Sequence, residues 1–281
     1  MTDTVVVETP SYGRFIAIRG DLITQQLETF GAHTRNELAM LLSFVRPGDI
    51  VLDVGGHIGT FAIPMAMKGA RVTAIEANPS TFELLSRNIA LNGVEVRAIN
   101  AAVARAPTRF RVAQMDEDNT GSAELVEDPA GEIRGLPLDD LDLASVDLIK
   151  IDIEGMEYDA LVSAAGLIGR CRPLVYFEYS RRRVRRRGGS PDQIRDFIRA
   201  HGYDVFMNIG ERNSANDAFR LMRVGDIDLP GGLADFLLIP RDSPRYPPAA
   251  MVAGASSAAM AMVRRRAKNA VKRIRRRLLR A

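Results

Sequence analysis

A glycine-rich turn follows one of the apolar segments of the sequence. The segment Asp53-Val54-Gly55-Gly56-His57-Ile58-Gly59 comes directly after the apolar stretch that begins at Ile50. Glycines at such a place allow a tight strand-to-helix turn, and they let a bound molecule contact the backbone. The pattern therefore predicts a ligand-binding turn at the end of a strand.

A single carboxylate completes this pattern further along the chain. Glu76 ends the next expected strand and lies 23 positions after Asp53. A carboxylate there can accept hydrogen bonds from both hydroxyls of an adenosine ribose. A glycine turn with an unrelated, solvated glutamate is the alternative, but the two features fall at matching strand ends. We therefore expect a nucleoside cofactor.

The residues of the turn also indicate which nucleoside cofactor binds. Dinucleotide-binding turns have the pattern G-x-G-x-x-G, and here Val54 occupies its first glycine position. Asp53, just before the turn, would repel a pyrophosphate. Its negative charge suits the cationic amino-acid end of S-adenosylmethionine, either directly or through water.

A second group of carboxylates follows a later strand. The segment Lys150-Ile151-Asp152-Ile153-Glu154-Gly155-Met156-Glu157 ends an expected strand over 147–153. If the strand continues that far, its alternation places Asp152 and Glu154 on one side, at the end that faces the ligand crevice. An alcohol needs a base to remove its proton, so Asp152, and next Glu154, are the candidate catalytic residues. Capping of the next helix, or binding of the cofactor's amino group, is the alternative role.

The elements that must position these residues alternate between strand and helix. This order predicts right-handed βαβ units and a mostly parallel sheet with helices on both faces, in the α/β class. The expected strands are 50–54, 71–76, 94–99, 147–153, 174–179, 203–209 and 234–239, with a small extra strand over 108–112 and a polar loop over 116–122. The expected helices are 36–45, one after Gly59, 78–92, 156–168 and 191–200.

Three stretches of the sequence resemble one known family. DIVLDVGGHIGTFAIPMA, ARVTAIEANPSTFELLSRNIALNG and LIKIDIEGMEYDAL are similar to FkbM-type methyltransferases, over roughly 38–178. The resemblance implies the class I methyltransferase (Rossmann-like) fold, S-adenosylmethionine as cofactor, and O-methylation, often of sugars or natural products. The residues that correspond to the family's cofactor-binding positions are Asp53, Gly55, Gly56, His57, Gly59, Glu76, Asn100 (near the adenine) and Asp152. His57 departs from the family, which usually has Asn there. Three roles are open for it: a polar contact near the cofactor, proton transfer, and capping of the next helix.

Composition narrows the class of protein. The 281 residues are 46% hydrophobic and 26% charged, which is ordinary for a globular protein. The single cysteine, Cys171, suits a reducing cytoplasm, and we expect a cytoplasmic protein. The N-terminus lacks a signal-peptide pattern, and no apolar segment is long enough to cross a bilayer. The three histidines and the one cysteine show no metal-ligand spacing, so we predict no metal site, and no G-x-S-x-G hydrolase pattern occurs.

Basic residues are concentrated in two places. Ten Lys/Arg and no acid lie in the segment 260–281, although the whole chain has a net charge of only +3. Apolar residues recur there every three or four positions, which predicts an amphipathic helix. Four roles of this segment remain open: peripheral binding to an anionic membrane, binding to RNA, docking on the body of the protein or another subunit, and a solvated tail. Six arginines within 181–187 indicate an anionic acceptor or a solvated loop.

We therefore divide the chain into an N-terminal segment (1–35), a methyltransferase domain (36–240) and a Pro-containing exit with the basic tail (241–281). The expected function is methyl transfer to an oxygen of a small molecule or sugar, with an anionic group on the acceptor as one alternative. A nucleic-acid methyltransferase is the second hypothesis, suggested by the tail, and a non-catalytic cofactor-binding protein is the third. The sequence leaves the oligomeric state open.

Overall fold

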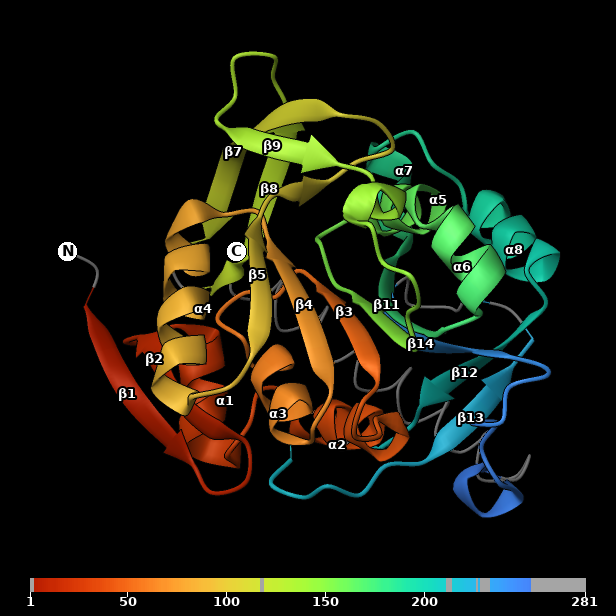
Figure 1. Cartoon of the computed structure of the whole chain (residues 1–281), viewed down its shortest axis with the longest axis horizontal. Helices are drawn as coiled ribbons and strands as arrows, with labels where there is room; N and C mark the ends of the chain where they lie inside the picture. The colour runs from red at the N-terminus through yellow and green to blue at the C-terminus, as the bar shows by residue number, and fades with distance from the viewer. Residues whose placement is uncertain (1–2, 117–118, 211–213, 226, 228–232, 254–281) are drawn as a thin grey trace, which may run out of the picture.

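A computed structural model describes residues 3–116, 119–210, 214–225, 227 and 233–253 of the chain. Its centre is an eight-stranded sheet (Figure 1). In spatial order its strands are β13 (Leu221–Val224), β12 (Tyr203–Asn208), β14 (Leu233–Pro240), β11 (Leu174–Ser180), β10 (Leu148–Ile151), β3 (Ile50–Val54), β4 (Arg71–Glu76) and β5 (Val96–Asn100). The five strands from β11 to β5 are parallel, and β14 runs antiparallel to both β11 and β12.

The order of the strands reverses in the middle of this sheet. From β3 the chain continues outward to β4 and β5, whereas from β10 it continues to β11 on the other side. Ligands of open α/β sheets bind outside the carboxyl ends of the strands at such a switch point. The topology therefore places the site where β3 and β10 end.

Helices cover both faces of the sheet, as expected. Val51 and Leu148 pack with Leu41 on one face, whereas the next residues, Leu52 and Ile149, face the opposite core. The first face is covered by α2 (Arg35–Phe44), α3 (Ala62–Met67) and α4 (Pro79–Asn92). The second is covered by α5 (Glu157–Ser163), α6 (Ala165–Cys171) and α8 (Pro191–Ala200).

The N-terminal segment packs on α4. It forms β1 (Thr4–Thr9), β2 (Gly13–Ile18) and α1 (Leu22–Phe30). The buried Asn88 of α4 pairs with the backbone of β2: its Oδ1 accepts from Ile16 N at 2.7 Å, and its Nδ2 donates to Ile16 O at 3.1 Å. Nδ2 also donates to Ile58 O at 2.9 Å. One side chain thus joins the hairpin to the glycine turn.

A second sheet lies between β5 and β10 in the sequence and above the end of the main sheet in Figure 1. Its strands are β6 (Ala102–Val103), β9 (Ile133–Leu136), β7 (Thr108–Asp116) and β8 (Asn119–Glu127). The expected small strand is therefore longer than predicted, and most of the expected polar loop belongs to β8. The remaining short elements are α7 (Arg181–Arg186) and the 3₁₀ helices η1 (Leu138–Leu141) and η2 (Ala249–Met251).

Two expected elements of the main α/β unit also differ in extent. The strand expected over 147–153 ends at Ile151, because Glu154 and Gly155 both adopt left-handed backbone angles, with φ of 56° and 109°. The helix expected over 156–168 is interrupted at Ala164. Ser163 Oγ donates to Ala160 O at 2.9 Å there, and such back-bonding bends helices.

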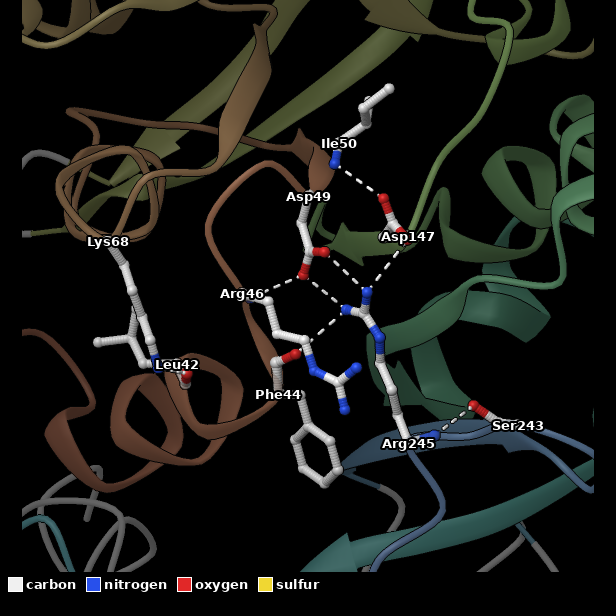
Figure 2. A network of polar contacts seen from close by, with 9 residues as sticks. All are labelled: Leu42, Phe44, Arg46, Asp49, Ile50, Lys68, Asp147, Ser243 and Arg245. Atoms are coloured by element: carbon white, nitrogen blue, oxygen red, sulfur yellow. Dashed lines mark hydrogen bonds and ion pairs between the residues drawn. The ribbon is translucent and has the colours of Figure 1, made fainter.

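A polar network fastens the exit segment to the beginnings of β3 and β10 (Figure 2). The guanidinium of Arg245 donates to both carboxylate oxygens of Asp49, at 2.6 and 2.7 Å, and to Asp147 Oδ1 at 3.1 Å. Asp147 Oδ2 in turn accepts from Ile50 N at 2.9 Å. The network lies at the end of the strands opposite the switch-point crevice, so its role is structural.

No helix in the described ranges has the length and apolar character needed to span a bilayer. The predicted amphipathic helix of the tail lies outside the described residues.

Candidate functional site

The glycine turn brings the ends of β3 and β10 into contact. The backbone N–H groups of Gly55 and Gly56 both donate to Ile75 O at 2.9 Å. Gly55 has a φ of +82°, and a Cβ on it would lie 2.0 Å from Asp152 O. Only glycine fits here, because both the left-handed backbone and the approach of Asp152 exclude a side chain.

Glu76 holds the turns that follow β3 and β4. Its Oε2 accepts from His57 N at 2.8 Å, and its Oε1 accepts from Asn78 N and Thr81 Oγ1, both at 2.9 Å. An ionised carboxylate has about four lone-pair positions, so one remains for a hydroxyl of a ligand. Glu76 is thus a fixed acceptor on the wall of the site.

His57 has a left-handed backbone with φ of 47°, a conformation that His and Asn adopt more readily than most residues. Burial lowers the pKa of its imidazole, so the ring is neutral at pH 7. The N-cap of α3 is Phe61, so the capping role considered for His57 is wrong. Its backbone N–H donates to Glu76 and the residue lines the cavity, so a proton-transfer role of the imidazole stays a prediction.

Asp53 and Lys150 form a buried ion pair. Lys150 Nζ lies 3.0 Å from Asp53 Oδ1 and donates to Gly55 O at 3.1 Å. Burial raises the pKa of Asp53, and the attraction of Lys150 offsets part of that rise. Burial opposes the charged form of Lys150 too, but Asp53 and Asp152 outweigh it and leave its pKa raised. Lys150 is therefore a cation at neutral pH.

Asp152 and Glu154 follow β10 but are not on one face of a strand, since the strand has already ended. Asp152 N donates to Val54 O at 3.0 Å, which fixes it beside β3. Glu154 instead pairs with Arg183, which also binds Glu178. The two candidates therefore have different surroundings in one crevice.

Burial strongly affects the acids of this crevice. It raises the pKa of Glu154 to about 7, although Arg183 opposes the rise. It also raises the pKa of Glu157 to about 7, although Gly155 N donates to its Oε1 at 2.9 Å. Glu157 is the first residue of α5, and its side chain holds the turn before the helix through Gly155 N.

One cavity of about 360 Å³ lies at the switch point, a size typical of small-molecule sites. Of the predicted site residues, its lining contains Gly55, Gly56, His57, Glu76, Asp152 and Glu154.

Three predicted cofactor residues are not part of this lining. Asp53 is completely buried behind Lys150, so the expected contact with a ligand is not direct. Gly59 makes room for packing, because a Cβ on it would lie 2.8 Å from Ile63 Cδ1. The exposed Asn100 donates to Glu76 O and Ala77 O, at 2.9 and 3.1 Å, and so ties β5 to the end of β4. Its place near an adenine stays a prediction.

Several lining residues were missed by the sequence analysis. Gln26, His33 and Thr34 come from the N-terminal segment and the turn before α2, and Lys150 and Arg183 supply the two cations of the wall. The N-terminal residues carry no motif, so only the folded chain identifies them. Lys150 was visible as the first residue of the acidic signature.

Most of the arginine cluster forms the short helix α7, not a loop. As one of the two expectations has it, four of its six members are exposed to solvent: Arg182, Arg185, Arg186 and Arg187. Arg183 is bound by two carboxylates, Arg186 pairs with Glu124, and Arg187 Nη2 donates to Leu125 O at 2.7 Å. The contacts of Arg186 and Arg187 join this segment to β8, whereas Arg183 lines the cavity with its charge matched by two carboxylates. Within the described residues, no group of His, Cys, Asp and Glu is arranged to hold a metal ion.

Comparison with known families decides which protein class this is. The model of the methyltransferase FkbM domain matches residues 53–205, more than half of the chain. The chain belongs to the FkbM methyltransferase family. It is therefore a methyltransferase with the class I fold, and S-adenosylmethionine is its cofactor.

Curated relatives match over a short stretch. The tRNA (guanine(37)-N(1))-methyltransferase of Phytophthora infestans is 36% identical over 66 residues, which are 24% of this chain and 16% of that protein. The 23S rRNA (uracil(1939)-C(5))-methyltransferase of Halomonas elongata is 45% identical over 64 residues, which are 23% of this chain and 13% of that protein. The matches thus span less than a fifth of the length of these relatives.

Solved structures resemble the chain only distantly. A methyltransferase FkbM from Methylobacillus flagellatus is 18% identical, with a TM-score of 0.41, over 68% of this chain and 43% of that one. The Pyrococcus abyssi tRNA (uracil-54, C5)-methyltransferase, solved with S-adenosyl-L-homocysteine, is 11% identical, with a TM-score of 0.44, over 84% of this chain and 43% of that one.

Proposed function

We propose that this FkbM-family methyltransferase methylates a hydroxyl oxygen of a small molecule or sugar, with Asp152 as the general base. The observation that carries the proposal is one cavity at the switch point that combines the glycine turn and Glu76 with Asp152 and Glu154. The first pair of features suits a nucleoside cofactor, and the second suits proton transfer beside it.

The residues present fit S-adenosylmethionine. Glu76 has a remaining acceptor position for a ribose hydroxyl, and the turn at Gly55 and Gly56 presents backbone without side chains. The cavity volume is that of a small-molecule site. When bound, the cofactor supplies an electrophilic methyl group.

The chain's own contribution is to orient the acceptor and to take its proton. An alcohol is a poor nucleophile until its proton is removed, and a carboxylate at hydrogen-bond distance can accept that proton in the transition state. Glu154 is held by Arg183, which fixes its carboxylate and suits a positioning role. Asp152 is fixed through its backbone beside β3 and lines the same cavity as the glycine turn, and it is the proposed base.

The charge of the cavity favours a neutral acceptor. Four carboxylates line it, those of Glu76, Asp152, Glu154 and Glu178, against the two cations Lys150 and Arg183. Since Arg183 is already bound to two of these carboxylates, a phosphate or carboxylate on the acceptor would meet net negative charge.

A nucleic-acid acceptor is the second candidate. It is supported by the names of the tRNA and rRNA methyltransferases that match part of the chain, and by the ten basic residues of the tail. The acidic cavity disfavours it, because phosphates flank every base. A base would have to be extended into the cavity, as enzymes that modify bases do.

Transfer of labelled methyl groups from S-adenosylmethionine tests both candidates. The acceptor samples are a panel of monosaccharides and hydroxylated small molecules, and total tRNA. We expect labelling of a neutral hydroxyl compound and a loss of about 10²–10⁴-fold in the Asp152→Asn variant, with S-adenosyl-L-homocysteine binding retained. Labelled tRNA with an unlabelled panel would overturn the proposal. A near-normal rate of Asp152→Asn would move the base to Glu154.

A further inference from the structure

The two cations on the wall of the cavity differ in what they already bind. The guanidinium of Arg183 is shared between Glu154 and Glu178. The ammonium of Lys150 has three N–H donors, and its contacts are the Asp53 carboxylate at 3.0 Å and Gly55 O at 3.1 Å. One donor of Lys150 therefore remains for a ligand.

The surroundings of Lys150 direct this donor to the cavity. Asp53 lies behind Lys150 and is completely buried, whereas Lys150 belongs to the lining. The ring of Phe61 flanks the ammonium, with its centroid 5.1 Å from Nζ. The amino-acid end of a cofactor in this part of the site thus meets the cation and not Asp53, which reverses the polarity inferred from the sequence.

A second polar group lines the same cavity. Thr34 precedes α2 with a left-handed φ of 42°, which is unusual for a β-branched residue. Although it occupies the N-cap position, its side chain makes no capping hydrogen bond, and its buried Oγ1 has no hydrogen-bond partner among the described residues. Strained residues of this kind cluster at ligand-binding positions.

The two groups are linked through Phe61. The ring of His33, the neighbour of Thr34, contacts the edge of Phe61, with 6.3 Å between ring centroids. All four residues line the cavity. The turn before α2 and the end of β10 therefore form one corner of the site, with a free N–H donor of a cation on one side and a hydroxyl on the other.

We propose that Lys150 and Thr34 form the binding site for the carboxylate of the cofactor's amino-acid end, with the Lys150 ammonium as counter-ion and the Thr34 hydroxyl as a second donor. Asp53 then acts indirectly, by holding Lys150. Only S-adenosylmethionine as cofactor is required, so the assignment is independent of the acceptor. It also gives the turn before α2 a role in the site, since Thr34 supplies one of the two donors.

The test compares two ligands that differ only in this carboxylate: S-adenosyl-L-homocysteine and its decarboxylated analogue, S-adenosyl-3-thiopropylamine. Calorimetry on the wild-type chain should show the analogue binding about 10–100-fold more weakly. In the Asp53→Asn/Lys150→Gln variant, which removes both charges of the buried pair together, the two ligands should bind within about threefold of each other.

A pair of Thr34 variants provides an independent measurement. Thr34→Ser keeps the hydroxyl and Thr34→Ala removes it, while both relieve the β-branched strain. Preference for the carboxylate-bearing ligand should be about 3–10-fold lower in Thr34→Ala than in Thr34→Ser. This comparison decides the question if the double variant does not fold.

Each contrary outcome has its own meaning. Equal affinity of the wild-type chain for the two ligands would overturn the carboxylate site, as would an unchanged preference in the double variant. Equal preference in the two Thr34 variants would overturn the role of the hydroxyl. Failure of both ligands to bind the wild-type chain would instead contradict the cofactor.

Discussion

The close approach of Gly55 to Asp152 predicts that even one added methyl group disturbs the site. In Gly55→Ala the new Cβ would lie 2.0 Å from Asp152 O, and the backbone would keep a φ of +82°. The left-handed conformation costs a non-glycine residue about 1–2 kcal/mol. Relief of the overlap needs a backbone shift, which costs about 1–3 kcal/mol more. We therefore expect a loss of about 2–5 kcal/mol in the free energy of unfolding.

A matched control separates the two contributions. Gly48 has a φ of +88°, and a Cβ on it would meet nothing within 4 Å. Gly48→Ala should therefore lose only the backbone contribution of about 1–2 kcal/mol and bind S-adenosyl-L-homocysteine normally. Gly55→Ala should lose affinity as well, because the shift moves Asp152 and the turn. Urea unfolding and calorimetry on both variants measure the two effects, and equal losses in stability with unchanged affinity would refute the reasoning.

Three further predictions concern pH, the exit segment and the tail. Burial raises the pKa of Glu157 from 4.5 to about 7, so between these values the folded chain retains a proton that the unfolded chain releases. The free energy of unfolding of the wild type should therefore fall as the pH rises to 7. Glu157→Gln does not titrate, so in urea unfolding its stability relative to wild type should rise by about 2–3 kcal/mol from pH 5 to pH 8. Arg245→Met should lose about 2 kcal/mol in the same assay with unchanged cofactor affinity in calorimetry, because its contacts to Asp49 and Asp147 are at the opposite end of the strands. A chain ending at Ala253, whose N–H still donates to Leu221 O at 2.7 Å, should bind cofactor normally, and only the full chain should be recovered with anionic vesicles or RNA.

Contrary results for these three are distinct. A stability difference between wild type and Glu157→Gln that stays constant from pH 5 to 8 would mean that Glu157 does not titrate in this range. Weaker cofactor binding in Arg245→Met would show that its network reaches the site. Equal recovery of both chains with anionic vesicles, neutral vesicles and RNA would exclude a partner role for the tail.

The sequence predicted those parts of the fold that local signals determine. The strands at 50–54 and 71–76 and the helix at 191–200 have the predicted bounds, because apolar runs, glycines and a Ser-Pro start mark their ends. The glycine turn and Glu76 were found together, since the turn follows β3 and Glu76 ends β4, its neighbour in the sheet.

Contacts between segments distant in the sequence could not be predicted. Arg183 was interpreted as a ligand for anions or a solvated residue, but its charge is matched by Glu154 and Glu178. Thr34 entered the site through the packing of the N-terminal segment, which no motif records. Asp53 was expected to face the cofactor, and only the folded chain places Lys150 in between. In each case the partner is chosen by tertiary packing.

Calorimetry with S-adenosyl-L-homocysteine and NAD, on the wild-type chain and on Glu76→Ala, tests the central claim that the switch-point cavity is the cofactor site. The structure predicts that S-adenosyl-L-homocysteine binds the wild-type chain and NAD does not. Loss of the Glu76 carboxylate should weaken binding by about 1–3 kcal/mol, or roughly 5–150-fold. Arg245→Met, which alters contacts at the opposite end of the strands, should keep its affinity. Binding of NAD without S-adenosyl-L-homocysteine, or unchanged affinity in Glu76→Ala, would contradict the account.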